Sequence, residues 1–557
     1  MSGSARPHEI VILGGGTAGW MAATLMQRHW GERRVRITLV ESPEIGSIGV
    51  GEGSTPALRR FFENADIAES QWMARCNATY KLNIRFVGWS PQSGVPDYCH
   101  PFITQLDAFN ERPFVVNCLT RRLGLDVNTE PGRFLLNGLL ARQKKGPLVP
   151  PNFPFRVEYG YHFDSALLGR YLGEVAMSRG VRRVSTKVVG GVLNGHGDLA
   201  ALACEDGSRI AGDLFVDCSG FSSVLLQQAL GVKFRGFKEN LFNDAAVVLP
   251  TPAPTTLPVE TVAHALRAGW CWHIPLTARQ GNGYVYSSDF LTPEQAEREL
   301  RTHLGLLDSA VAARHLKMKV GQVERHWHRN CLALGLSQGF IEPLEATALH
   351  LVQTTIEAFI SRYDAGAMSQ QHQDDFNRDV SERFERVRDY IVAHYKLNTR
   401  DDSDYWRANR DNLQLSEPLL QLLHLWFQKA DIVPEIEARK DASHFGVLSW
   451  HCLLAGYGKF PHLAAAQPGK GDLYCDASVE AFLHGCSLNF GSHEQCLAGT
   501  WPLSVAAILT GSLNSSPRTR RRPDPLHIEA HPFRVRRTRR AQETYVIPFQ
   551  LHHLYTH

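Results

Sequence analysis

Short apolar runs separated by a glycine-rich turn and a helix open the chain. Residues 10–13 (IVIL) are uninterrupted apolar positions, a pattern typical of a strand buried on both faces. Trp20, Ala23 and Leu25 then begin a helical pattern, and a second run of strand character, VRITLVE, ends at Glu41. This order of strand, turn, helix and strand predicts a parallel βαβ unit.

Later segments repeat the strand-to-turn pattern and then become helical. Residues 212–223 (GDLFVDCSGFSS) predict a strand that runs into a glycine turn, and residues 330–351 predict a strand, a glycine-rich loop and a helix. Pro343 and Glu345 are expected in the first turn of that helix. Downstream, apolar side chains recur at helical spacing at Phe376, Val380, Phe384, Val387 and Ile391.

Two strand-like segments carry residues that the pattern alone explains as ordinary structure. In residues 269–276 (GWCWHIPL), Trp270 and Trp272 fall on one face of a strand, where they would fill a core. In NATYKLNIRFVGW, Leu82, Ile84 and Phe86 alternate with polar residues that begin at Lys81. The alternation by itself places Lys81 on the polar side of a strand.

Composition places the chain among ordinary globular proteins. Hydrophobic residues are 43% and charged residues 21% of its 557 residues. No apolar run approaches the ~20 residues that cross a membrane, and the N-terminal residues lack the apolar core of a signal peptide. We therefore expect a cytoplasmic protein that does not bind a membrane.

The cysteine and histidine patterns change this picture little. There are eleven cysteines, an odd number, with no CxxC pair, which indicates free thiols in a reducing compartment. The 25 histidines are scattered, and their close sets lack a matching carboxylate or thiol spacing. We expect no metal site.

Charge is unevenly distributed along the chain. Residues 514–557 hold nine Arg and three acidic residues, a net charge of +6. Since the whole chain has a net charge of +3, residues 1–513 have a net charge of −3. A basic arm for nucleic acid is one interpretation. The absence of apolar periodicity favours a disordered tail instead, and nucleic acid is not the expected partner.

The glycines after the first strand carry the first chemical signal. They form a GxGxxG motif at Gly14, Gly16 and Gly19, and Glu41 follows 22 residues later at the end of the second strand. In this context the first glycine allows a tight turn, the second admits a pyrophosphate and the third lets the helix pack closely. The helix N-terminus favours phosphate, and Glu41 is expected to accept hydrogen bonds from ribose hydroxyls. A second glycine-rich segment at residues 45–56 favours FAD over NAD.

Five motifs together resemble one enzyme family. They are GGGTAGW (14–20), GVGEGSTP (49–56), NATYK (77–81), WCWHIP (270–275) and GFIEPLEAT (339–347). In this order they resemble flavin-dependent halogenases of the tryptophan halogenase type, from about residue 8 to about residue 490. The WxWxIP element is the most specific part.

The resemblance implies a fold and a domain arrangement. It implies an α/β protein with the FAD/NAD(P)-binding, Rossmann-like fold of flavin monooxygenases, a mixed β substrate region and an α-helical C-terminal part. Residues 1–375 would form the FAD domain with inserted substrate segments at 91–154 and 236–319. Residues 376–513 would form a helical substrate-side domain, followed by the basic tail at 514–557.

The resemblance also implies a reaction. Reduced FAD (FADH2), O2 and a halide (chloride or bromide) would give hypohalous acid, which travels to Lys81 and halogenates an aromatic ring by electrophilic substitution. Lys81 would act either as an ammonium donor or, if a dry pocket lowers its pKa, as an amine that forms a haloamine. Glu345, in preference to its neighbour Glu342, would hold the oxidant, stabilise the cationic ring and accept its proton.

Further residues are assigned by the same resemblance. Thr347 and Ala348 would hold the halide, His100 and Phe102 would lie near the substrate, and Trp270 with Trp272 would separate the flavin from that substrate. The expected cofactor residues are Gly14, Gly16, Thr17, Ala18, Gly19, Glu41, Val188, Leu336 and Leu349.

Two departures from the family pattern bear on specificity. The commoner ESTGI is here EATAL, so that Ala348 replaces a glycine; this favours bromide over chloride or weakens halide binding. Residues 442–458 lack the side chains by which tryptophan halogenases grip the amino acid. The chain would therefore belong to a subgroup that halogenates a free indole, a phenol, a pyrrole or a larger aromatic.

Two other functions remain open on the sequence. An aromatic monooxygenase of the same fold is one, although two tryptophans between flavin and substrate argue against it. A non-catalytic flavin-binding relative is the other, and the presence of Lys81 and Glu345 argues against it. Because there is no second GxGxxG for a nicotinamide cofactor, we expect a separate NAD(P)H-dependent flavin reductase as partner.

Overall fold

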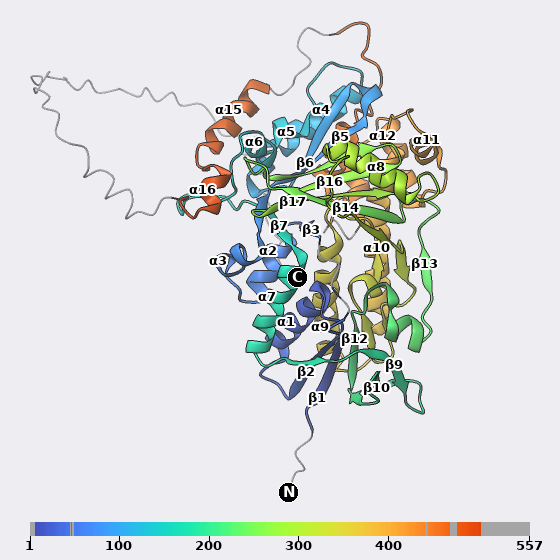
Figure 1. Ribbon diagram of the computed structural model, residues 1–557. Coiled ribbons are helices and arrows are strands. Elements are labelled where there is room, and N and C mark those ends of the chain that lie inside the picture. The colour runs from blue at the N-terminus through green and yellow to red at the C-terminus, as the bar shows by residue number, and fades with distance from the viewer. Residues whose placement is uncertain (1–5, 45, 47–49, 440–443, 468–475, 503–557) are drawn as a thin grey trace, which may run out of the picture. The chain divides into compact units, whose positions relative to one another are not determined.

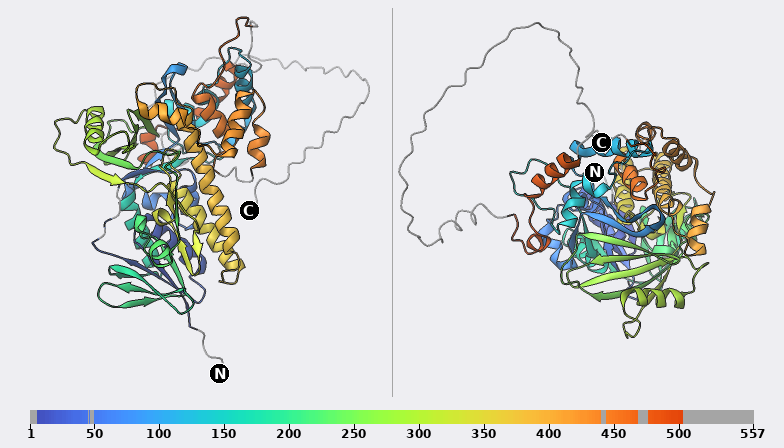
Figure 2. Two further views of the ribbon diagram at one scale, coloured as in Figure 1. Left: turned by 90° about the vertical axis from the view of Figure 1, so that its right-hand side faces the viewer. Right: turned by 90° about the horizontal axis from the view of Figure 1, so that it is seen from above.

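The computed structural model describes residues 6–44, 46, 50–439, 444–467 and 476–502 (Figures 1 and 2). The predicted basic tail at 514–557 lies outside these residues. Residues 1–503 form one compact unit, and the following description concerns that unit alone.

A six-stranded sheet near the N-terminus is the predicted nucleotide-binding layer. Its order is β20-β21-β12-β1-β2-β8, parallel throughout except for the edge pair β20–β21. The strands are β1 (His8–Leu13), β2 (Val35–Glu41), β8 (Arg182–Ser185), β12 (Leu214–Asp217), β20 (Trp327–His328) and β21 (Cys331–Ala333). Three segments far apart in the sequence therefore build one parallel sheet, which confirms the Rossmann-like α/β fold.

Helix α1 (Thr17–Trp30) follows β1 directly and packs against α7 (Ser165–Ser178) and α9 (Ala348–Ala365). The close approach of α1 to the end of β1 depends on glycine, because a Cβ on Gly19 would lie 1.9 Å from the carbonyl oxygen of Gly14. Gly14 itself has φ +115°, a conformation that other residues rarely adopt. These glycines place the N-terminus of α1 at the carboxyl end of β1.

A seven-stranded mixed sheet forms the second layer (Figure 1). Its order is β18-β14-β17-β16-β15-β5-β6, with the β15–β5 pair parallel and the other pairs antiparallel. The strands are β5 (Asn83–Ser90), β6 (Val95–Pro101), β14 (Ala245–Pro252), β15 (Glu260–Leu266), β16 (Gly269–Pro275), β17 (Arg279–Tyr286) and β18 (Arg314–Lys317). This sheet is the mixed β region that the resemblance implied.

Three small sheets complete the β structure. They are β3 (Gly51–Gly53) with β7 (Gly160–Asp164) and β4 (Thr79–Lys81), β9 (Val188–Leu193) with β10 (Leu199–Cys204) and β11 (Arg209–Ala211), and β13 (Phe234–Gly236) with β19 (Gly321–Val323) and β22 (Gly339–Phe340). The first of these lies against the seven-stranded sheet through β16 and β17.

The remaining helices lie around these sheets and in the C-terminal part. They are α2 (Ala57–Asn64), α3 (Glu69–Trp72), α4 (Ala108–Arg122), α5 (Pro131–Phe134), α6 (Leu136–Arg142), α8 (Pro293–Leu304), α10 (Gln373–Lys396), α11 (Asp404–Asp411), α12 (Glu417–Phe427), α13 (Val433–Ala438), α14 (Val447–Gly456), α15 (Asp476–Ser487) and α16 (His493–Leu497). The long helix α10 lies beside α9 (Figure 2). All five residues predicted from its apolar spacing are buried, which confirms that helix. Among the described residues, no helix combines the length and apolar character needed to span a bilayer.

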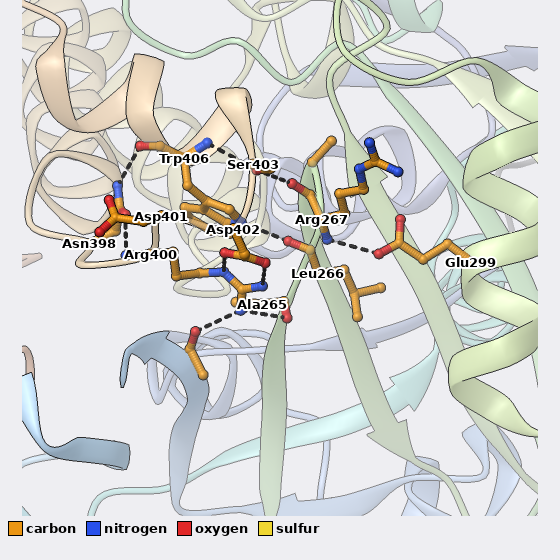
Figure 3. Close-up of polar contacts among 12 residues, drawn as sticks. Ala265, Leu266, Arg267, Glu299, Asn398, Arg400, Asp401, Asp402, Ser403 and Trp406 are labelled. Carbon is orange, nitrogen blue, oxygen red and sulfur yellow. Dashed lines mark hydrogen bonds and ion pairs between the residues drawn. The ribbon is translucent and has the colours of Figure 1, made fainter. Parts of the chain in front are cut away.

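The end of β15 and the turn after it are tied to the start of α11 and the segment before it (Figure 3). Arg400 donates to the carbonyl oxygens of Gly88 and Ala265 at 2.8 and 3.2 Å, and the indole N–H of Trp406 donates to the Leu266 carbonyl at 2.7 Å. The Ser403 hydroxyl donates to the carbonyl of Arg267 at 2.6 Å. These bonds fix the end of β15 and the turn that leads into β16, the strand that carries the two tryptophans.

Candidate functional site

The glycine-rich turn presents an open backbone at the start of α1. Gly16 is the N-cap residue and has no side chain to satisfy the first N–H groups of the helix. A Cβ at Gly16 would meet nothing within 4 Å, so there is open space beside the backbone of the N-cap residue. An unfilled helix N-terminus of this kind suits a pyrophosphate.

The other predicted cofactor residues lie on segments that adjoin this turn. A Cβ at Gly15 would collide with the Glu41 carboxylate, so that carboxylate lies directly over the turn, where it also pairs with Arg183 at 2.5 Å. The segment leading to Val188 is bonded to the same strand end, since the Thr186 N–H donates to the Glu41 carbonyl at 3.0 Å.

Leu336 and Leu349 belong to segments that contact α1. Leu336 follows Gly335, which lies close to Ala18. A Cβ on Gly335 would be 2.8 Å from the Ala18 methyl group. Leu349 is in the first turn of α9, which packs on α1. The donor set and the open turn fit a dinucleotide such as FAD.

Lys81 is completely buried, contrary to its predicted place on the polar side of a strand. The reason is that the chain changes sheets at Leu82: Lys81 ends β4, which pairs with β7, whereas β5 joins the seven-stranded sheet. Alternation along one strand therefore does not describe this segment. The exposed fraction of Lys81 is 0%, and its Nζ has no hydrogen-bond partner among the described residues.

Burial dominates the electrostatics of the Lys81 amine. Burial lowers the pKa of Lys81 to about 7, and the charge of Glu345 opposes this shift. The Nζ lies 5.3 Å from the centre of the Phe102 ring. A Cβ at Gly53 would lie 3.1 Å from the Nζ, so the glycine leaves room beside the amine.

A hydrogen-bonded chain that sequence reasoning missed adjoins Lys81. The Thr79 hydroxyl donates to the Pro275 carbonyl at 2.8 Å and lies 3.0 Å from His162 Nδ1, which must therefore supply the proton. His162 Nε2 is then the acceptor for the Thr261 hydroxyl at 2.9 Å. Burial, with the nearby Lys81 charge, lowers the pKa of His162 well below its usual value. A neutral histidine thus lies beside the amine and adds no second charge.

Glu345 is held by two histidines in the buried centre of the structure. His100 Nδ1 lies 3.0 and 3.1 Å from its two carboxylate oxygens, and His394 Nε2 lies 2.9 Å from one of them. Burial alone would raise the pKa of Glu345, but the interactions with His100 and His394 lower it to about 2. Burial lowers the pKa of His394, so we describe Glu345 as ionised and His394 as a neutral N–H donor.

His394 was not identified from the sequence, although a signal existed. It continues the apolar stripe of α10 after Val387 and Ile391, and it is a polar residue at a core position. A buried polar group requires a partner, which here is the Glu345 carboxylate. His100, which the resemblance assigned to the substrate side, reaches the same carboxylate from β6.

The turn before α9 differs from the prediction. The helix begins at Ala348 with Thr347 as its N-cap, so Pro343 and Glu345 lie outside it and not in its first turn. Ala346 has φ +56°, a left-handed conformation that prevents a helix from continuing through this residue. The buried Thr347 hydroxyl has no hydrogen-bond partner among the described residues, and it stands at the helix N-terminus expected to hold a halide.

Trp270 and Trp272 lie on one face of β16, as predicted. Their ring centres are 6.1 Å apart and both side chains are buried. The Trp270 indole N–H donates to Glu342 at 2.8 Å. The ring of Trp272 occupies the space above Gly283, where a Cβ would be 2.1 Å from the ring. The tryptophans therefore form a fixed aromatic wall.

Glu342 has a structural role in this arrangement. It accepts hydrogen bonds from Asn243, Trp270 and Tyr395 at 2.7 to 2.8 Å, and burial raises its pKa. All three donors reach the same carboxylate oxygen, Oε2, and so hold the carboxylate in one orientation. The structure thus separates the two neighbouring glutamates: Glu342 anchors the wall and Glu345 adjoins the buried lysine.

Comparison with known proteins agrees with this geometry. The family profile described as tryptophan halogenase matches residues 9–468. Tryptophan 6-halogenase SttH of Streptomyces toxytricini is 38% identical over 448 residues, covering 75% of this chain and 84% of that protein. Tryptophan 7-halogenase RebH of Lentzea aerocolonigenes is 30% identical over 502 residues, covering 82% and 91%.

A solved structure is similar over nearly its whole length. BrvH, a flavin-dependent halogenase from Brevundimonas sp. BAL3, aligns with a TM-score of 0.76 and 32% identity, covering 89% of this chain and 99% of that one. The profile match, the extent of these alignments and the buried lysine and glutamate lead to one conclusion: the chain belongs to the tryptophan halogenase family.

Proposed function

We propose that this protein is an FADH2-dependent halogenase that transfers halogen from hypohalous acid to an electron-rich aromatic ring by way of Lys81. The observation that carries the proposal is the buried, unpartnered amine of Lys81 within the electrostatic influence of Glu345. A buried lysine without a partner destabilises a fold, and such groups are characteristic of functional sites.

The cofactor would lie along the glycine-rich turn. The backbone of Gly14, Gly16 and Gly19 would leave room for the pyrophosphate, and the N–H groups of Thr17 and Ala18 would bind it. Glu41 would accept hydrogen bonds from the ribose hydroxyls. Apolar contacts to the cofactor would come from Val188, Leu336 and Leu349. When bound, reduced FAD would supply two of the four electrons that reduce O2; the halide would supply the other two and become hypohalous acid, with water as the second product.

Lys81 would hold the hypohalous acid and direct its halogen toward the ring. With a pKa of about 7, both the ammonium and the amine are populated near neutral pH. The ammonium would donate a hydrogen bond to the hypohalous oxygen, which makes the halogen more electrophilic. The amine would instead exchange a proton for halogen and release water, giving a haloamine.

Glu345 would stabilise the cationic ring that forms when the halogen adds. Its carboxylate is ionised and oriented by His100 and His394 before the substrate arrives, so no reorganisation is needed in the transition state. The ring cation is a strong acid, and a weakly basic carboxylate is sufficient to accept its proton. The halogen thus replaces a ring hydrogen.

The halide would bind where α9 begins. Thr347 offers an unpartnered hydroxyl together with the helix N-terminus. Ala348 adds a methyl group at a position where the commoner family sequence has glycine, and we expect this change either to favour bromide over chloride or to weaken halide binding.

The substrate would be an electron-rich aromatic of the indole, phenol or pyrrole type. Phe102 lies beside the Lys81 amine and His100 beside the Glu345 carboxylate. Phe445 stacks on Tyr390 with 3.6 Å between the ring centres. Phe445 and Trp450 also line a cavity of about 470 Å³, whose other lining residues are mostly charged, among them Glu385, Arg386 and Asp389. Free tryptophan is not the favoured substrate, because residues 442–458 lack the side chains by which tryptophan halogenases grip the amino acid.

An aromatic monooxygenase is the alternative with the same cofactor. It requires the ring to contact the flavin directly, and the separating role that the family resemblance assigns to Trp270 and Trp272 argues against this. A separate NAD(P)H-dependent reductase would supply FADH2. The cysteines of the described residues are free thiols, which supports a reducing compartment, the cytoplasm.

The test combines the protein with a flavin reductase, NADH, FAD, O2, bromide and indole, followed by mass spectrometry. Brominated indole is the expected product. A gain of one oxygen would identify a monooxygenase, and no product across a panel of aromatics would identify a non-catalytic relative. Lys81→Ala is expected to abolish halogenation while flavin oxidation continues; loss of FAD binding in this variant would mean that the lysine is structural.

The pH dependence of single-turnover halogenation identifies the reacting form of Lys81. We expect an inflection near pH 7. A rate that falls with rising pH would identify the ammonium, and a rate that rises would identify the amine. A profile that is flat from pH 6 to pH 9 would contradict a role for this group.

A further inference from the structure

Strand β16 has a second face that the halogenation site does not use. Trp270 and Trp272 point to one side of the strand, so Cys271 and His273 point to the other. Helix α8 packs on the sheet that contains β16 (Figure 1) and contributes His303 to this second face. Three side chains of the types that bind transition metals therefore meet behind the tryptophan wall.

The distances within this cluster are close to those of a metal site. One ligand atom from each of Cys271, His273 and His303 lies within 4.8 Å of the others. The Nε2 atoms of His273 and His303 are 3.0 Å apart. Two nitrogen ligands of a tetrahedral Zn²⁺ are roughly 3.3 Å apart, given Zn–N bonds of about 2.0–2.1 Å. The two histidine nitrogens would therefore have to separate by only a few tenths of an ångström to bind one ion.

The hydrogen bonds of Asn282 orient the His273 ring for metal binding. The Asn282 amide N–H groups donate to the Leu249 carbonyl at 3.1 Å and the Thr251 hydroxyl at 3.0 Å. Its oxygen consequently faces His273 Nδ1 at 2.8 Å, and Nδ1 must carry the proton. The lone pair of His273 is then on Nε2, directed at His303. A histidine ligand that donates its other N–H to a carbonyl oxygen is the usual arrangement around bound zinc.

The charge state of the cluster also suits a divalent cation. Burial lowers the pKa of His273, and burial together with His264 and His273 lowers the pKa of His303 to about 4. Both rings are thus neutral near pH 7 and have lone pairs to offer. Burial raises the pKa of the Cys271 thiol, so one proton must leave when a metal binds.

We propose that Cys271, His273 and His303 bind one Zn²⁺ ion, with water as the fourth ligand beside His264. On binding, the Cys271 thiol releases its proton to solvent and forms the Zn–S bond. The proton on His303 Nε2 moves to Nδ1, so that both Nε2 lone pairs bind the ion. The ring of His264 lies 4.6 Å from that of His303, adjacent to the position of the water.

The site departs from the sequence expectation of no metal for a tertiary reason. Cys271 and His273 are two residues apart, but His303 lies 30 residues further along, on a helix. No common zinc spacing describes this set. The ion would join α8 to the strand that carries the tryptophan wall, at a place separate from Lys81 and Glu345.

The experiment uses the full chain after treatment with a chelator. Zn²⁺ is added, the protein is dialysed and its metal content is measured by mass spectrometry; Co²⁺ serves as a spectroscopic probe of thiolate ligation. We expect one Zn²⁺ per chain, a thiolate-to-cobalt charge-transfer band, and a rise in the thermal midpoint with Zn²⁺. His303→Gln and Cys271→Ser are expected to weaken Zn²⁺ binding at least ~100-fold.

Matched variants distinguish this site from other thiols and imidazoles. His424→Gln and Cys486→Ser change a histidine and a cysteine outside the cluster, and neither is expected to alter Zn²⁺ affinity. Because Cys271 is buried, FAD binding checks the fold of its variant, and His303 on the half-exposed face of α8 provides the second test. The proposal is overturned by substoichiometric Zn²⁺, by a Co²⁺ spectrum without a thiolate band, or by unchanged affinity in the His303 variant.

Discussion

Replacing Lys81 by methionine should stabilise the folded protein at neutral pH. Methionine has nearly the same length but no charge to bury. The folded pKa of Lys81 is about 7, against 10.5 for the free side chain. Between these values the unfolded chain holds a proton that the folded lysine has lost, so stability rises with pH across this window.

The size of the effect follows from the same two values. At about 1.4 kcal/mol per pKa unit, the buried lysine destabilises the fold by about 4 kcal/mol at pH 7 and by about 1 kcal/mol at pH 9.5. Lys81→Met should therefore exceed the native protein in unfolding free energy by about 4 kcal/mol at pH 7, with most of the difference lost at pH 9.5. Packing differences between the two side chains do not depend on pH and cannot produce this trend.

Urea unfolding of the two proteins, followed by tryptophan fluorescence at both pH values, measures the difference. Lys233→Met is the matched control, because Lys233 is exposed, and its substitution should give no pH-dependent difference. Equal stabilities of Lys81→Met and the native protein at pH 7 would refute the reasoning, as would a gain of the same size at both pH values. Either result would mean that the amine is hydrated or paired.

Three further predictions concern the reaction. Glu345→Gln keeps the shape of the side chain but removes its charge, and should lower the halogenation rate by about 10²–10⁴-fold in single-turnover assays; an unchanged rate would exclude the carboxylate from the mechanism. Gly283→Ala places a methyl group against the Trp272 ring. It should destabilise the fold by about 1–3 kcal/mol and lower the yield of halogenated product per FADH2 oxidised. If yield and melting temperature stay at the native values, the Trp272 ring can move without cost. Ala348→Gly should raise chlorination relative to bromination in a competition assay with both halides, and an unaltered product ratio would separate this methyl group from halide choice.

Much of the fold was predictable because its signals are local. The apolar run before Gly14, the glycines needed for a tight turn and the acid at position 41 identify a nucleotide-binding βαβ unit within a few tens of residues. The helical spacing from Phe376 to Ile391 likewise predicts α10. The prediction that Pro343 and Glu345 lie in the first turn of a helix was wrong. The helix begins only after Ala346, whose left-handed conformation nothing in the sequence indicates.

The sequence by itself determined the βαβ unit, the shared face of Trp270 and Trp272, and the family, since these depend on neighbouring residues and on motif order. Only the tertiary structure decided that Lys81 is buried and that Glu345 is ionised. Burial and charge depend on partners that are distant in the chain: His100 and His394 lie 245 and 49 residues from Glu345. The pKa of each group follows from those contacts, which no local pattern contains.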